Sequence, residues 1–183
     1  MIRPNRSTAL AAACAVASIT ASPALAGEVF AGAATHNLDI GIAVCCYERG
    51  ADIQVGARTD PFARLLGGEL RAHVLGSVNT AGGVDFGAVG LDLRYPLGDR
   101  FYIAPGLGGA IHDGPGQKFQ ATNDRIYFGS RLLFEPELSL GWTMSSNWAT
   151  ELSYTHLSHA QLGGHHNPGM DQLGARVVYR FGR

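Results

Sequence analysis

After residue 26, apolar and polar residues alternate in segments of about ten residues, and turn-forming residues separate these segments. Successive side chains of a strand point to opposite faces, so this alternation predicts strands with one apolar and one polar face. No run of about 18 apolar residues follows residue 26, which argues against a membrane-spanning helix there. The pattern predicts eight strands, near residues 28–38, 51–59, 69–79, 84–95, 100–112, 125–141, 147–158 and 170–181.

The two faces of these strands differ in a way that a soluble sandwich does not explain. In 125–141, one parity holds Ile126, Phe128, Leu132, Phe134, Leu138 and Leu140, and the other holds Arg125, Arg131, Glu135 and Glu137. Charged residues share their parity with small residues, as in a narrow polar barrel interior with lipid outside. The sequence therefore predicts an all-β fold, an eight-stranded antiparallel up-and-down transmembrane β-barrel, with the inward charges in a buried salt-bridge network.

The connections between the predicted strands differ in length. If both termini lie on the periplasmic side, the inner turns at 96–99 and 142–146 are short, and most outward connections are longer. Outer-membrane barrels have this asymmetry. The inner connection at 60–68 is longer than the pattern requires.

The first 26 residues have the features of an export signal. Arg3 and Arg6 precede an Ala-rich apolar run that ends in Ala24-Leu25-Ala26. We expect cleavage after Ala26, so that 1–26 is a signal peptide and 27–183 is the barrel domain. The exported chain keeps Cys45 and Cys46, which could form a vicinal disulfide or remain two thiols.

The overall charge bears on the class of partner. The net charge is -1 and 16% of residues are charged, with no basic stripe. Binding to nucleic acid depends on such a stripe, so the sequence predicts no nucleic-acid partner.

Polar residues on the apolar parity of the last two strands predict a site. His156 and Ser158 share the lipid-facing parity of 147–158, and Asp171 shares that of 170–181. Polar groups facing lipid are costly unless they satisfy one another, and Ser, His and an acid together form an activated nucleophile. The alternative is that the strand ends before His156 and that these are ordinary interfacial residues.

The histidines of this region could instead bind a metal. His156, His159, His165 and His166 match no ligand spacing, and adjacent residues such as His165 and His166 point apart. We therefore expect no metal site, and we expect His165 and His166 to lie in an exposed loop.

The stretches "HLSHA" (156–160) and "NPGMD" (167–171) resemble the lipid A 3-O-deacylase (PagL) family, and 128–142 resembles its sixth strand. The resemblance implies that His156 is the base, Ser158 the nucleophile and Asp171 the acid, where the family typically has Glu. It also implies that Asn167 and the backbone N–H groups after Ser158, at Ala160 and Gln161, contact the oxyanion or substrate. His159 stands where many members have Asn.

The implied function is an outer-membrane serine esterase that hydrolyses the ester-linked 3-hydroxyacyl chain at the 3-position of lipid A. This scheme requires no cofactor, and its partners are lipopolysaccharide and the outer membrane. The sequence leaves open whether the barrel forms a homodimer. The alternative is a small non-catalytic outer-membrane barrel with a structural, adhesive or lipid-binding role.

Overall fold

Antiparallel strands make up almost all of the regular structure in a computed structural model of the chain, which describes residues 27–38, 48–115, 125–162 and 168–181. The strands are β1 (Glu28–Thr35), β2 (Ala51–Arg58), β3 (Ala63–Leu65), β4 (Gly68–Asn79), β5 (Phe86–Leu97), β6 (Phe101–His112), β7 (Leu132–Thr143), β8 (Trp148–Leu157) and β9 (Met170–Arg180). No helix in these ranges is long and apolar enough to cross a bilayer. The predicted signal peptide (1–26), Cys45, Cys46, His165, His166 and Asn167 lie outside the described residues.

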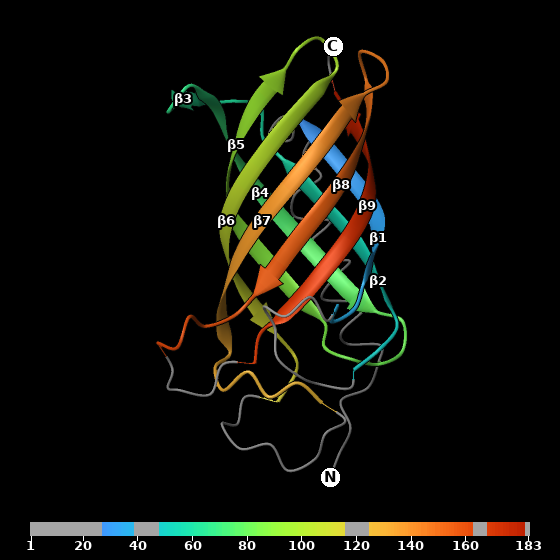
Figure 1. Cartoon of the computed structure of the whole chain (residues 1–183), viewed down its shortest axis with the longest axis vertical. Helices are drawn as coiled ribbons and strands as arrows, with labels where there is room; N and C mark the ends of the chain where they lie inside the picture. The colour runs from blue at the N-terminus through green and yellow to red at the C-terminus, as the bar shows by residue number, and fades with distance from the viewer. Residues whose placement is uncertain (1–26, 39–47, 116–124, 163–167, 182–183) are drawn as a thin grey trace.

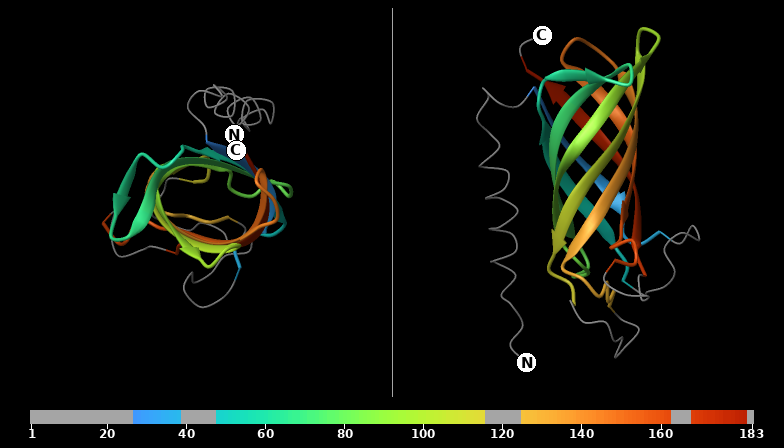
Figure 2. Two further views of the ribbon diagram at one scale, coloured as in Figure 1. Left: turned by 90° about the horizontal axis from the view of Figure 1, so that it is seen from above. Right: turned by 90° about the vertical axis from the view of Figure 1, so that its left-hand side faces the viewer.

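The sheet closes on itself. Neighbouring strands follow the order β2-β1-β9-β8-β7-β6-β5-β4, and pairing of β2 with β4, from Asp52↔Asn79 to Arg58↔His73, completes the ring. Seen along its axis, the ring is complete (Figure 2). The predicted eight-stranded barrel is confirmed, and β3 is an additional short strand outside the ring (Figure 1).

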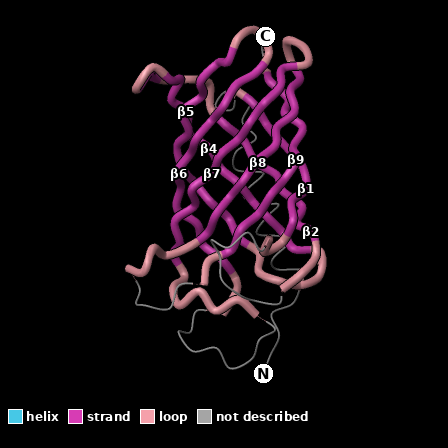
Figure 3. Tube along the Cα trace, viewed as in Figure 1, coloured by secondary structure: helices cyan, strands magenta, loops and turns pink. Residues whose placement is uncertain are grey.

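The strand ends define two ends of the barrel. At one end, which we call the terminal end, β1 begins and β9 finishes, with Glu28 paired to Arg180. The connections 59–67, 98–100 and 144–147 also lie there. At the opposite end, which we call the loop end, the connections 36–50, 80–85, 113–131 and 158–169 leave and rejoin the strands. Figure 3 shows the described parts of these loops gathered at that end.

A network of ion pairs fills the interior of the barrel from the terminal end towards its middle, as expected from the inward parity. The guanidinium of Arg58 bonds to the carboxylates of Glu28 and Glu151, at 3.0 and 2.9 Å. Arg176 pairs with Glu137 at 2.8 Å. Further pairs join Arg71 to Glu28 and Asp92, Arg180 to Glu28, and His73 to Glu135. Because these charges are buried, removing one partner would leave another uncompensated.

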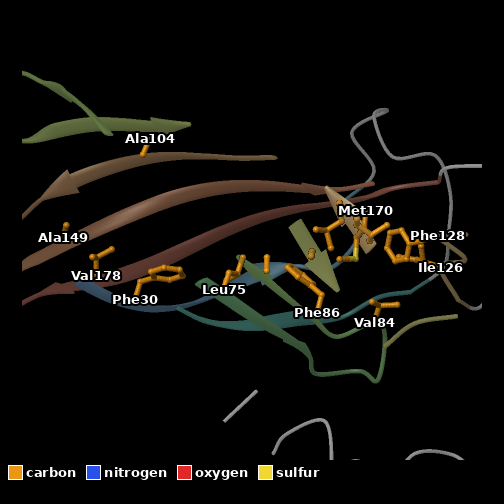
Figure 4. Packing of buried hydrophobic residues seen from close by; sticks show 14 of the residues in the cluster. Phe30, Leu75, Val84, Phe86, Ala104, Ile126, Phe128, Ala149, Met170 and Val178 are labelled. Atoms are coloured by element: carbon orange, nitrogen blue, oxygen red, sulfur yellow. The ribbon is translucent and has the colours of Figure 1, made fainter. Parts of the chain in front are cut away.

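The predicted strand 125–141 is wrong at its beginning, since β7 starts only at Leu132. Ile126 and Phe128 are fully buried and belong to the apolar cluster inside the barrel. Figure 4 shows them beside Met170 at one end of that cluster. Arg125 and Arg131 are likewise not part of the interior network. The alternation of 125–131 places apolar side chains into the mouth of the barrel, where an apolar interior is as favourable as lipid.

Glu48 fastens the segment 125–131 over the loop end. Its carboxylate accepts hydrogen bonds from the backbone N–H groups of Val84 (2.8 Å) and Ile126 (3.0 Å). It also pairs with Arg125 at 3.1 Å and with His36 at 2.9 Å. The opposite ring nitrogen of His36 bonds to Asp52. One buried carboxylate thus joins residues of three connections, 36–50, 80–85 and 113–131, at the mouth of the barrel.

Candidate active site

Two neighbouring strands bring His156 and Asp171 together at the loop end. β8 and β9 are antiparallel, and their register pairs His156 directly with Asp171 and Leu157 with Met170. Both polar residues lie on the outward parity, two positions from Tyr154 and Leu173 respectively. The inward residues Leu157 and Met170 are fully buried and support the pair from inside the barrel.

The two side chains are hydrogen bonded. Nδ1 of His156 lies 2.7 Å from Oδ1 of Asp171. A carboxylate can only accept a hydrogen bond, so Nδ1 carries the proton, and Nε2 of the neutral ring keeps a free lone pair. The Asp171 carboxylate is buried, and the His156 side chain is 16% exposed. This is the orientation that a general base requires.

Tyr154 is a member of the site that the sequence did not single out. Its hydroxyl donates a hydrogen bond to the same Oδ1 of Asp171, at 2.5 Å. Tyr154 precedes His156 by two residues and therefore lies on the same face of β8. The sequence signal that could have found Tyr154 was this shared parity with His156. On alternation alone, Tyr154 counts as an ordinary lipid-facing aromatic residue.

Gly169 is a second residue of the site that the sequence did not single out. Its φ is +68°, and a Cβ placed on it would lie 3.0 Å from Cε1 of His156 and 3.3 Å from the carbonyl oxygen of Leu157. Glycine is therefore required both by the backbone conformation and by the imidazole beside it. Pro168 and Gly169 are buried. The chain here passes against the imidazole, so the site faces the bilayer less openly than parity predicts.

Two hydrogen bonds tie the start of β9 to residues at and just beyond the end of β1. The N–H of Leu38 donates to the carbonyl of Asp171 at 2.8 Å. The N–H of Leu173 donates to the Thr35 hydroxyl at 3.0 Å. The backbone of Asp171 is thus anchored on the side away from β8.

Ser158 lies just beyond the end of β8, where its backbone forms a bridge with Phe134 of β7. Ser158 N–H donates to Phe134 at 3.2 Å, and Phe134 N–H donates to Ser158 at 2.7 Å. The residue is 8% exposed. It follows His156 by two positions, at a Cα spacing of about 6.5–7 Å along an extended chain. Among the described residues, its hydroxyl forms no hydrogen bond with His156.

The chain turns sharply after Ser158. Ala160 and Gln161 have φ values of 49° and 61°, and Leu162 N–H donates to the carbonyl of His159 at 2.9 Å. Consecutive non-glycine residues in the left-handed region are uncommon, and such strain gathers at functional sites. His159 itself is buried. Within the described ranges, no group of three or more His, Cys, Asp or Glu residues is arranged to hold a metal ion.

Comparisons with known proteins agree with this architecture. The crystal structure of the outer membrane enzyme PagL is similar to the chain, with a TM-score of 0.56 at 18% identity, covering 81% of this chain and 97% of that one. The solution NMR structure of the de novo designed TMB2.3 has a TM-score of 0.52 at 13% identity, covering 87% of this chain and 97% of that one. At these identities the likeness concerns the fold.

Sequence comparison is more specific. A search of curated proteins found no match. The sequence model of the family described as lipid A 3-O-deacylase (PagL), however, matches residues 66–180, which is more than half of the chain and includes β4 to β9. The chain therefore belongs to the lipid A 3-O-deacylase (PagL) family of outer-membrane β-barrels.

Proposed function

We propose that this barrel is a serine esterase that removes the 3-hydroxyacyl chain esterified at the 3-position of lipid A, with Ser158, His156 and Asp171 as its triad. The observation that carries the proposal is the 2.7 Å hydrogen bond between Nδ1 of His156 and Oδ1 of Asp171. Family membership supports the substrate class.

Direct pairing across the β8–β9 ladder supports an aspartate as the acid of the proposed triad. Residues opposite each other in an antiparallel pair have Cβ atoms about 4.5–5.5 Å apart, which is within reach of a short carboxylate. Asp171 stands directly opposite His156. The longer Glu that is typical of the family is therefore not needed to reach the imidazole.

In the proposed reaction, Oγ of Ser158 attacks the ester carbonyl carbon while Nε2 of His156 takes the hydroxyl proton. The tetrahedral intermediate collapses, His156 returns the proton to the 3-oxygen of the sugar, and an acyl-enzyme remains. Water then attacks the acyl carbon and gives a proton to His156. The 3-hydroxy fatty acid leaves, and Ser158 recovers its proton. Asp171 holds the imidazole in one tautomer and stabilises its positive charge during both transfers.

Preorganised donors would stabilise the oxyanion. We assign this role to Asn167 and to backbone N–H groups in the turn after Ser158, at Ala160 and Gln161. The left-handed conformations of Ala160 and Gln161 support a specialised role for this turn.

The position of the triad suits a substrate held in a bilayer. His156 and Asp171 lie on the outward parity at the loop end of the barrel. We propose that the loop end faces outward, so that the triad meets the outer leaflet, where lipid A resides. Export with removal of residues 1–26 is part of this proposal and is tested by N-terminal sequencing of the barrel.

The test compares lipid A by mass spectrometry from a Gram-negative host that expresses wild type or Ser158→Ala. Wild type should remove one hydroxyacyl chain, and Ser158→Ala should leave lipid A intact. Ser146→Ala, the same change in an exposed turn at the terminal end, is the matched control and should keep full activity. Unchanged lipid A with folded wild-type protein would exclude the deacylase.

The absence of a hydrogen bond between Ser158 and His156 in the described residues favours a second function, a non-catalytic lipid-binding barrel. Catalytic hydrogen bonds are often long in substrate-free enzymes, so this observation carries less weight than the His156–Asp171 bond. The same experiment separates the two functions.

A further inference from the structure

The connection between β2 and β4 folds into a hairpin of its own, residues 59–68, which we call the side hairpin. β2 pairs with β4 only as far as Arg58↔His73. Beyond that point β3 takes the free edge of β4, with Ala63 paired to Leu70 and Leu65 to Gly68. The hairpin stands away from the barrel wall at the terminal end, as both Figure 1 and Figure 2 show.

The two faces of the side hairpin differ in polarity. Ala63 and Leu65 lie on the face of Leu70 and Gly68, and this parity continues along β4 to the outward, partly exposed Ala72. The other face carries Arg64, whose guanidinium lies 3.7 Å from the carboxylate of Glu69. The apolar face of the hairpin is therefore continuous with the lipid-facing wall of the barrel.

The tip of the side hairpin is a two-residue turn with an unusual first residue. Leu66 and Gly67 both have positive φ, 52° and 84°, as in a type I′ turn, where Asn-Gly is strongly preferred. Leu66 is 82% exposed, and Leu65 is 50% exposed. A leucine here is unfavourable for the backbone and, in water, for hydration. Contact of the side chain with an apolar environment removes the cost of hydrating it.

Aromatic residues mark the level of the bilayer interface at the same end. Phe101, Trp142, Trp148 and Phe181 are exposed at the strand ends of the terminal end, and the rings of Trp148 and Tyr179 pack at 4.9 Å. Aromatic girdles of this kind lie at the headgroup level of outer-membrane barrels. The side hairpin projects sideways from the wall at this end (Figure 2). In a membrane with this girdle at headgroup level, it would lie among the lipids beside the wall.

We propose that the side hairpin is an interfacial anchor, with Leu65 and Leu66 inserted at the boundary between headgroups and acyl chains of the phospholipid leaflet at the terminal end. The ion pair of Arg64 and Glu69 faces the water. This anchor is separate from the triad, which lies at the opposite end of the barrel. Because the side hairpin stands out on one side of the wall only, it fixes the height of the barrel in the membrane on that side.

The test uses single-tryptophan variants of the full barrel in phosphatidylcholine vesicles whose acyl chains carry bromine near the headgroup. Leu66→Trp is made in a Trp142→Phe/Trp148→Phe background, and Arg64→Trp in the same background is the matched control on the opposite face. Retention of Trp148 alone gives a reference at the interface. Heat-dependent gel mobility checks that each variant is folded.

Bromine should quench the fluorescence of Trp at position 66 to an extent similar to that of Trp148, with a blue-shifted emission, and should quench position 64 much less. Equal, weak quenching at positions 66 and 64, with emission typical of water, would overturn the anchor. A blue-shifted emission at position 66 that is lost when more lipid is added per protein would also overturn the anchor. In that case a second copy of the chain, and not lipid, would cover Leu66.

Discussion

His156 and Asp171 face each other directly across the β8–β9 ladder, and the imidazole and carboxylate are joined at 2.7 Å. Tyr154 donates to the same carboxylate oxygen. Asp171 is therefore held by two donors from β8, while its own backbone is bound to Leu38. In the proposed serine esterase, a rigidly held carboxylate at position 171 would keep His156 in place through two proton transfers.

Replacing Asp171 by Asn should lower kcat by about 10²–10⁴-fold, because the amide presents a donor to Nδ1 and favours the wrong tautomer. Asp171→Glu should keep part of the activity, since it retains the charge but adds a methylene to a buried site. Initial rates of deacylation in mixed micelles measure both variants. Full activity of the Asn variant would exclude Asp171 as the acid.

Tyr154→Phe removes one of the two donors to Asp171 and keeps the ring. A hydrogen bond to a charged group contributes about 1.5–3 kcal/mol, so we expect kcat to fall by roughly 10-fold or more while KM changes little. Tyr179→Phe, on the outward face of β9 near the terminal end, is the control and should leave both constants unchanged. A change in KM alone would indicate that Tyr154 contacts substrate instead of positioning the acid.

Gly169→Ala should reduce both stability and activity, because the new Cβ would lie 3.0 Å from the His156 ring at a positive φ. Gly98→Ala separates the two effects, since Gly98 has a similar φ of +73° and a Cβ added there would meet no atom within 4 Å. Both variants should lose about 1–2 kcal/mol of unfolding free energy. Only Gly169→Ala should lose activity beyond its loss of folded protein, as measured by urea titration and deacylation rates.

The cluster at the mouth of the barrel should make stability depend on pH. Burial lowers the pKa of His36, but hydrogen bonds to Asp52 and Glu48 outweigh it and raise the pKa from 6.5 to about 9. A raised pKa means that the stabilisation is complete below pH 6.5 and is lost as the pH rises to about 9. The loss should be on the order of 2–3 kcal/mol.

His36→Gln should abolish most of this decline, because the titrating group is gone. The measurement is the urea midpoint of wild type and variant at intervals from about pH 6 to about pH 10, which spans the titration. Parallel curves over that range would show that His36 does not titrate there.

Sequence alternation predicted the barrel because a lipid-facing wall and a polar interior impose a strict period of two on every strand. It failed at Ile126 and Phe128, which share the sequence parity of the lipid-facing residues Leu132 and Phe134 but are buried in the barrel mouth. Alternation records which residues share a face and does not say what that face contacts. β3 was missed for a different reason, since a strand of three residues, Ala63–Leu65, is too short for a period of two to be recognised.

For the candidate site, too, local alternation predicted some features while others depend on tertiary contacts. Parity placed His156 and Asp171 on the outward face, because parity depends only on the local strand geometry. Their direct pairing depends on the β8–β9 register, which involves residues on both sides of the 158–169 connection. The roles of Tyr154 and Gly169 depend on contacts made only after that register is set.

The sequence alone thus determined the class of fold, the number of strands in the ring and the face on which the polar residues lie, because these follow from local periodicity. The tertiary structure decided which polar groups meet, how deeply Asp171 and Ser158 are buried, and that residues 59–68 leave the wall as a side hairpin. These features depend on contacts between residues far apart in the chain, and a period of two carries no information about such contacts.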